Sequence, residues 1–275
     1  MAAAGHSPLA GGARPRRELM RHEELSVLHS ALTLAGYGTA YSVASLVGSR
    51  CKRRSRQDAD YDFVIMWERL FDPHDSDSNI AVDTQWLSSS RVDLIHFRRD
   101  WALGFSEFFS QTGRLDGDWG LMSGEGFLAL LQQASFLSGD AAVLRRIQQA
   151  LTYPMSFRRH VLAQNFGRII NSLVAARRPR SRAMQIKTMA DFLDSSLRII
   201  YASEGRFYST PKWFDQDIAR AHVPSGVRAA LLQVVESPPE RWFASGLVAT
   251  MLLEEWHPKV ARHADLSELR RLAES

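Results

Sequence analysis

The sequence predicts an α+β protein, in which a small mixed sheet is followed by a set of helices. Up to about residue 100, short apolar runs alternate with polar residues and end at Gly- or Asp-containing stretches, as strands do. Beyond that point, long segments repeat their apolar residues every three or four positions, as amphipathic helices do. We therefore expect a disordered leader at 1–17, a sheet domain at 18–100 and a helical domain at 101–275.

The sheet domain is expected to contain one helix and three strands. Leucines at helical spacing predict the helix over 17–35, and glycines follow it. Runs of apolar residues predict strands at 41–47, 60–66 and 91–97. In the second of these strands Asp60 and Asp62 are two residues apart, so both carboxylates point to the same face of the sheet.

The second half of the chain is predicted to be helical throughout. Its periodic segments are separated by glycines and prolines, which end helices. Helices are expected at 121–137, 140–151, 157–176, 183–203, 224–235 and 239–256.

The composition is typical of a globular protein and excludes a disordered, collagen-like or disulfide-stapled chain. Of the 275 residues, 45% are hydrophobic and 23% are charged, and the formal net charge is +4. The single cysteine, Cys51, leaves no intramolecular disulfide. Residues 1–17 lack the apolar stretch of a signal peptide, and no run reaches the roughly 18 apolar residues of a membrane span. We expect a cytoplasmic protein.

One constellation in the sheet domain points to chemistry. Gly48-Ser49 ends the first strand, and ten residues later come Asp60 and Asp62, followed on the third strand by Asp93. This pattern resembles the signature of the polymerase-beta-like nucleotidyltransferase superfamily: Gly-Gly/Ser, a spacer near ten residues, Asp-apolar-Asp/Glu and a later strand carboxylate. Asp58 also begins an Asp-x-Asp pattern, but it leaves a shorter spacer and lies ahead of the apolar run, so Asp60 and Asp62 are preferred.

The resemblance implies a magnesium-dependent transfer of a nucleoside monophosphate from a nucleoside triphosphate to an acceptor hydroxyl. The carboxylates of Asp60, Asp62 and Asp93 would hold the metal, which prefers oxygen ligands, and Asp93 could accept the proton of the hydroxyl. Gly48 would let the backbone approach the triphosphate, and Ser49 would bind its terminal oxygens. AMP from ATP is the expected transfer.

The spacer departs from the superfamily pattern because it is strongly basic. Many members carry a second glycine where this chain has Arg54. The cluster from Arg50 to Arg56 contains five basic residues, which are able to grip a triphosphate or a nucleic-acid backbone. The alternative is a solvated loop in which only one or two of them touch a ligand.

A second, weaker resemblance lies in the helical domain. The segment from Tyr201 to Phe214 looks like a turn of antibiotic nucleotidyltransferases, in which an Asn/Glu-x-Arg-Phe/Tyr turn precedes Pro-Lys-Trp. By this resemblance Lys212 would pair with the triphosphate, and Arg206 would brace the turn or touch phosphate. The alternative is a helix start at Pro211 with Lys212 in solvent.

Several functions remain open at the level of the sequence. A small-molecule acceptor such as an aminoglycoside or lincosamide is favoured, and toxin-type modification of tRNA or protein uses the same strand carboxylates. A non-catalytic nucleotide- or RNA-binding module of the same fold is a further alternative, as is an unrelated α+β protein. No Gly-x-x-x-x-Gly-Lys-Ser/Thr loop is present, which argues against a P-loop NTPase. A monomer or homodimer without a membrane partner is expected.

Overall fold

A computed structural model describes residues 13–51, 60–68, 79–115, 123–177, 181–208 and 214–258, with side chains described from Arg21 onward. The chain divides into two compact units. Unit 1 comprises Met1–Glu107 and Leu130–Ala150, and unit 2 comprises Phe108–Ala129 and Leu151–Ser275. The sheet domain therefore differs from the expected 18–100, because a later segment of the chain returns to it.

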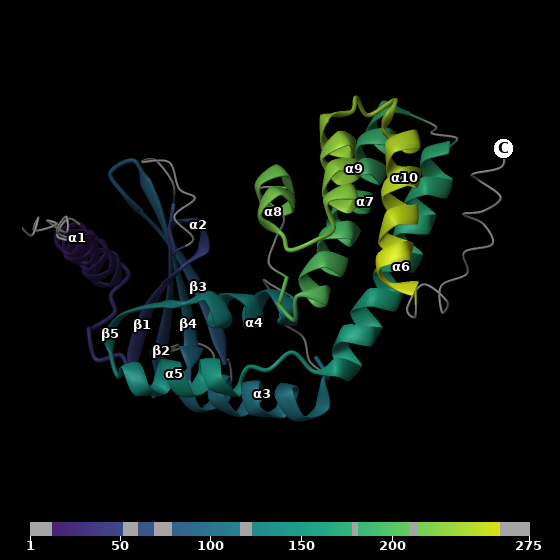
Figure 1. Cartoon of the computed structure of the whole chain (residues 1–275). Helices are drawn as coiled ribbons and strands as arrows, with labels where there is room; N and C mark the ends of the chain where they lie inside the picture. Colours follow the sequence, from purple (N-terminus) through teal and green to yellow (C-terminus); the bar gives the residue numbers. More distant parts are fainter. Residues whose placement is uncertain are drawn as a thin grey trace, which may run out of the picture. The chain divides into compact units, whose positions relative to one another are not determined.

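Within the described residues, unit 1 contains a five-stranded mixed sheet (Figure 1). Its order is β3-β4-β2-β1-β5, with β2 and β4 parallel and the other neighbours antiparallel. The strands are β1 (Val43–Val47), β2 (Tyr61–Trp67), β3 (Ile80–Leu87), β4 (Ser90–Arg98) and β5 (Ser135–Gly139). This sheet, followed by a largely helical second half, confirms the predicted α+β class.

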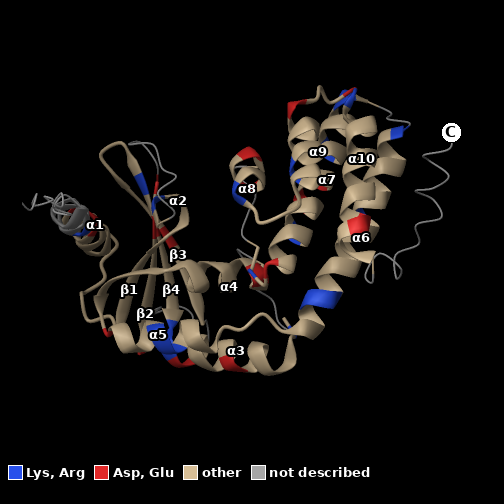
Figure 2. Cartoon of the chain, in the orientation of Figure 1, with Lys and Arg blue, Asp and Glu red and all other residues tan. Residues whose placement is uncertain are grey.

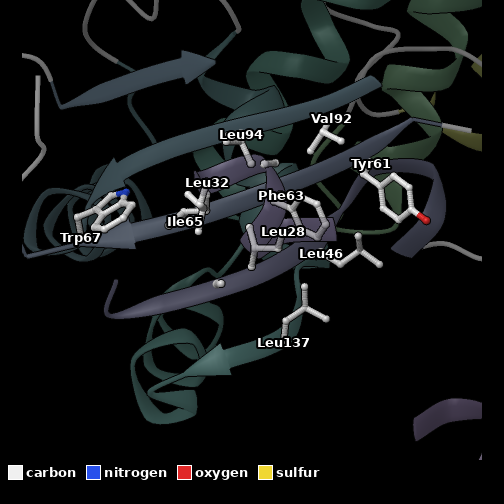
Figure 3. Close-up of a cluster of buried hydrophobic side chains, with 12 residues drawn as sticks. Leu28, Leu32, Leu46, Tyr61, Phe63, Ile65, Trp67, Val92, Leu94 and Leu137 are labelled. Carbon is white, nitrogen blue, oxygen red and sulfur yellow. The ribbon is translucent and has the colours of Figure 1, made fainter. Parts of the chain in front are cut away.

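One face of the sheet is covered by α1 (Ala13–Leu34), which begins a few residues before the predicted helix. Leu28 and Leu32 of α1 join alternate residues of β2 in one buried cluster (Figure 3). These β2 residues are the odd-numbered ones, including Phe63 and Ile65. Since successive strand residues point to opposite faces, Asp62 and the other even-numbered residues of β2 point away from α1.

A buried polar chain crosses the α1 face of the sheet. Trp67 Nε1 donates to His96 Nδ1 at 3.0 Å, and His96 Nε2 lies 3.3 Å from Asp83 Oδ2 without hydrogen-bond geometry. The hydroxyl of Tyr37, which follows α1, donates to the same Asp83 oxygen at 2.6 Å. Burial lowers the pKa of His96 to about 4 although Asp83 acts in the opposite direction, so the imidazole is neutral near pH 7.

The helices around the sheet explain why the expected boundary at residue 100 does not hold. The chain leaves β4 through α3 (Arg99–Thr112) and returns through α4 (Gly124–Gln133), β5 and α5 (Ala141–Ala150). The predicted helix at 121–137 extends too far, because α4 ends at Gln133 and residues 135–137 belong to β5, which pairs with β1. The amide of Gln148 on α5 donates to the carbonyls of Leu131 and Ala134, which fixes the ends of α4 and β5 to α5.

Unit 2 consists mainly of long helices around an apolar core. Its largest fully buried side chains include Trp242, Phe166 and Phe192. Gly246 lies against the Trp242 ring, and a β-carbon at that glycine would come within 2.7 Å of it. The helices are α6 (Met155–Arg177), α7 (Arg182–Ser203), α8 (Phe214–Arg220), α9 (Ser225–Glu236) and α10 (Trp242–Trp256).

No helix among the described residues is long and apolar enough to cross a membrane.

Candidate functional site

Asp62 and Asp93 lie side by side on the face of the sheet that points away from α1. They are register partners in the parallel pair of β2 and β4, and neighbouring strands are about 4.8 Å apart. The next residue on each strand, Phe63 after Asp62 and Leu94 after Asp93, is buried in the core under α1. Because successive strand residues point to opposite faces, both aspartates point away from α1. The two carboxylates therefore share one face within reach of a single cation.

Gly48 closes the site from the end of β1. It begins the short helix α2 (Gly48–Cys51) directly after Val47, the register partner of Asp62. Its φ is +70°, and a β-carbon at this position would lie 2.0 Å from Asp62 Oδ2. Only glycine fits, because any side chain would both strain the backbone and collide with the carboxylate.

Asp93 is held by two neighbouring side chains that the sequence did not reveal. Its Oδ1 accepts a hydrogen bond from Thr84 Oγ1 at 2.7 Å and another from Arg91 Nε at 3.0 Å. Thr84 is the register partner of Asp93 on β3, and Arg91 precedes it by two residues on β4. The row Gly48, Asp62, Asp93 and Thr84 therefore runs from the end of β1 across β2, β4 and β3.

Asp60, the third predicted carboxylate, directly precedes β2 and is exposed. In the part of the chain that the structure describes, no group of three or more His, Cys, Asp or Glu residues is arranged to hold a metal ion. The structure thus brings together two of the three predicted carboxylates. The oxygen donors of Asp62 and Asp93 fit a divalent cation that takes its remaining ligands from substrate phosphates and water.

Arg50 lies at the start of the basic cluster, next to residues of α1. Its guanidinium is 3.6 Å from the ring centre of Tyr61, whose hydroxyl donates to Glu23 Oε1 at 2.9 Å. Burial raises the pKa of Glu24, and the nearby positive charge of Arg50 opposes this rise. Burial likewise raises the pKa of Tyr61, together with its hydrogen bond to Glu23. Acidic residues of α1 therefore lie near Arg50. The local sequence around Arg50 did not indicate this proximity.

Other predicted residues are placed as follows. Ser49 lies in α2 beside Gly48. Cys51 donates its thiol to the carbonyl of Gln133 at 2.9 Å. The remainder of the basic cluster, residues 52–56, and Lys212 lie outside the described residues, so their contacts with a nucleotide stay predictions.

Arg206 braces the turn after α7 within unit 2, which is the first of the two roles considered for it. Its Nη1 donates to Glu204 Oε2 at 2.7 Å, and its guanidinium lies 4.6 Å from the ring centre of Tyr201. Gly205 takes a φ of +67° in this turn, where glycine carries no steric cost.

Unit 2 contains a partly buried ionic cluster that the sequence did not indicate. Arg198 of α7 donates to Glu125 Oε2 at 3.0 Å and to Asp194 Oδ2 at 2.9 Å, and it lies over the ring of Tyr208. The Tyr208 hydroxyl donates to Asp194, and its backbone N–H donates to Glu125. Burial raises the pKa of Glu125, while Arg198 opposes the rise.

A cavity of about 530 Å³ adjoins this cluster inside unit 2. Glu125 and Arg198 line it together with His160 and the buried Asn165. Ser123, at its rim, accepts a hydrogen bond from the Gly126 N–H and so caps the start of α4. No local sequence motif marks this cluster, because its members are up to 83 residues apart in the chain.

The fold and the site define an α+β protein with paired carboxylates on a mixed sheet. No protein-family model and no curated protein matches the chain. Among solved structures, a nucleotidyltransferase-like protein from Exiguobacterium sibiricum is similar over 89% of this chain and 78% of its own, at 13% identity and a TM-score of 0.42. A likeness this distant assigns no role to any residue of this chain.

Proposed function

We propose that the protein is a magnesium-dependent nucleotidyltransferase, which transfers a nucleoside monophosphate, AMP from ATP, to an acceptor hydroxyl. The observation that carries the proposal is the register pair of Asp62 and Asp93, with Gly48 against the Asp62 carboxylate. Two adjacent carboxylates on a sheet and a glycine that lets backbone approach them suit a metal-bound triphosphate.

The chemistry divides among the residues of this row. The acceptor oxygen attacks the α-phosphorus, a new P–O bond forms, and the bond to pyrophosphate breaks. Asp93 accepts the proton of the acceptor hydroxyl. Magnesium held by Asp62 and Asp93 would take its remaining ligands from the triphosphate and water, and would neutralise charge on the phosphates. The backbone at Gly48 and Ser49, with Arg50 and Lys212, would bind the remaining phosphate oxygens.

The acceptor is proposed to be a small hydroxyl-bearing molecule such as an aminoglycoside or lincosamide antibiotic. Within unit 2, the carboxylate of Glu125 and the guanidinium of Arg198 line a cavity of about 530 Å³, a size suited to a small molecule. Modification of tRNA or protein by the same strand carboxylates is the alternative within this chemistry. A cytoplasmic location and a monomeric or homodimeric state belong to the same proposal.

A second candidate is a nucleotide-binding module without turnover. It is favoured by the Arg91 guanidinium on Asp93, which occupies an oxygen that a metal would use. It is favoured also by the position of Asp60 outside the carboxylate pair. The two candidates differ in whether pyrophosphate is released.

The test incubates the protein with each α-phosphate-labelled nucleoside triphosphate, magnesium and a panel of antibiotics, tRNA and protein acceptors. Labelled acceptor and pyrophosphate are expected from the native chain and not from Asp62→Ala or Asp93→Ala. Asp100→Ala is the matched control, since its side chain is 70% exposed and lies outside the row. Unchanged product in both site variants would overturn the mechanism, and nucleotide binding without pyrophosphate release across the panel would favour the binding module.

A further inference from the structure

The edge of the sheet next to the carboxylate pair carries an exposed aromatic side chain. Trp86 of β3 is 64% exposed, the largest exposed fraction among the large hydrophobic residues described. The indole is the largest of the aromatic side chains, so leaving it in water gives up a large hydrophobic stabilisation. In the order β3-β4-β2-β1-β5, β3 is an outer strand.

The register places Trp86 on the same face as the carboxylates. Thr84 bonds to Asp93 on that face, and Trp86 follows Thr84 by two residues, about 7 Å along the strand. Asp83, by contrast, points to the α1 face, where it meets Tyr37. The Trp86 side chain and the bonded pair of Thr84 and Asp93 therefore lie on one continuous surface.

Arg91 connects the aromatic ring with the carboxylates. It is the register partner of Trp86 across the antiparallel pair, where side chains of partners are about 5 Å apart at their β-carbons. The Arg91 side chain is 45% exposed, and its Nε donates to Asp93 Oδ1. Asp60, which precedes the first paired residue of β2, and Arg91, which precedes its counterpart Val92, flank the same end of the two strands.

We propose that Trp86 and Arg91 form a stacking platform for a nucleobase, with the phosphates of the same ligand directed toward Asp93 and Asp62. An exposed aromatic face binds any base by stacking, and an adjacent guanidinium binds phosphate. Along this surface the aromatic ring of Trp86 would bind the base, the guanidinium of Arg91 a phosphate, and the carboxylates of Asp93 and Asp62 the metal. This proposal rests on the proposed function and names the part of the substrate that the edge of the sheet recognises.

The base can belong to the free nucleoside triphosphate or to an RNA acceptor, and binding measurements separate the two. The probes are ATP, a single-stranded RNA hexamer and inorganic tripolyphosphate, which has no base, each titrated with magnesium without an acceptor. The variants are Trp86→Ala and Trp86→Phe. The matched control is Leu34→Ala, an exposed apolar residue of α1, the helix on the opposite face of the sheet.

Trp86→Ala is expected to weaken ATP binding about tenfold and to leave tripolyphosphate binding unchanged, while Trp86→Phe restores most of the loss. A similar loss for all four nucleoside triphosphates is expected, because stacking is tolerant of the base. A loss confined to the RNA hexamer supports the platform as well and assigns it to the acceptor.

Equal binding of ATP and of RNA by native protein and Trp86→Ala would overturn the platform. The platform would also be overturned if Trp86→Ala changed the oligomeric state on size-exclusion chromatography and left ligand binding unchanged. Trp86 would then serve the contact of β3 with a second copy of the chain. Trp86-dependent ATP binding without transfer to any acceptor would overturn the proposed function and leave the platform standing. If native protein and Trp86→Ala transfer nucleotide equally and bind ATP and RNA with equal affinities, the platform would be overturned and the proposed function would stand.

Discussion

Gly48 is the residue at which the candidate site tolerates least change. Its positive φ costs a side chain about 1–3 kcal/mol, and the collision with Asp62 adds to that cost. Gly48→Ala is therefore expected to lower the free energy of urea unfolding by about 2 kcal/mol and to abolish transfer. Gly38→Ala is the control, because a β-carbon there meets nothing within 4 Å and its φ is ordinary. Equal stability of the two variants would contradict the close approach.

Arg91 acts on the carboxylate pair through its charge. Because its guanidinium is bonded to Asp93, it repels a cation bound there and occupies one oxygen. Two unit charges about 4 Å apart in water interact by about 1 kcal/mol, so a guanidinium repels a divalent cation by about 2 kcal/mol. Arg91→Gln is therefore expected to tighten the binding of Mn²⁺ alone up to about thirtyfold, as measured by titration calorimetry or electron paramagnetic resonance. Arg99→Gln, which bonds Asp100 and Glu68 on the surface, should leave Mn²⁺ affinity unchanged.

His96 makes the stability of unit 1 depend on pH. Burial lowers its pKa to about 4, below the value near 6.5 of the unfolded chain. The unfolded state then binds the proton more readily, so the contribution of the neutral imidazole is complete above pH 6.5 and is lost as the pH falls toward 4. The loss amounts to about 3 kcal/mol at most.

The variant that tests this pH dependence is His96→Asn, which keeps an acceptor for Trp67 Nε1. Urea unfolding between pH 4 and 7 is expected to show a smaller slope of stability against pH than in the native protein. His222→Asn, at an exposed position, is the control. An unchanged slope in His96→Asn would assign the pH dependence to other groups.

At the scale of elements, the hairpin of β3 and β4 carries both Thr84 and Trp86 and depends on a tight turn. Ser88 in this turn has a φ of 56°, the one positive φ of a residue other than glycine among those described. Ser88→Gly is expected to raise the free energy of unfolding by about 0.5–1 kcal/mol, because glycine removes the steric cost. Ser89→Gly, at the next residue, is the control and should not stabilise; the two are compared by urea unfolding.

The elements that the sequence predicted are those with continuous burial. The strands β1, β2 and β4 were found because their apolar runs are almost wholly buried. The strands β3 and β5 were missed because both are outer strands with few buried residues, so polar side chains interrupt their pattern. The helix α8 has 7 residues, too few to show a helical period.

The same limit applies to the site. The spacing of Gly48, Asp62 and Asp93 reflects strand ends and was readable from one sequence. The partners of Asp93 depend on the pairing of β3, which was not predicted. Had the Ser88-Ser89 turn been recognised, counting outward from it would have placed Thr84 opposite Asp93 and Trp86 opposite Arg91. The ionic cluster around Arg198 depends on tertiary packing and leaves no such trace.

At the scale of the whole molecule, the sheet is built from two separate stretches of chain. A fragment ending at residue 107 lacks β5, so the edge of β1 would lose its partner. Exposed edges of apolar strands promote association with other chains. The fragment 13–107 is expected to elute as aggregate on size-exclusion chromatography, whereas 13–150 should elute mainly at its own size. A monomeric, folded 13–107 fragment would show that β5 is dispensable.

The position of charge also differs between the two units. Figure 2 shows acidic and basic segments together on the strands of unit 1, where Arg91 and Asp93 are paired. In unit 2, opposite charges are paired in the partly buried group of Arg198, Glu125 and Asp194. The formal net charge of +4 for the whole chain therefore does not reveal these two local groups of paired charges.

The pairing of β1 with β5 has a consequence for how the protein is made. During synthesis, β1, β2 and β4 leave the ribosome early, but the strand that completes the edge of β1 ends only at Gly139 of 275 residues. Until then the nascent chain holds a partial sheet with an open apolar edge while α3 and α4 emerge behind it. A chaperone that shields nascent strands would therefore be needed most before translation passes this glycine.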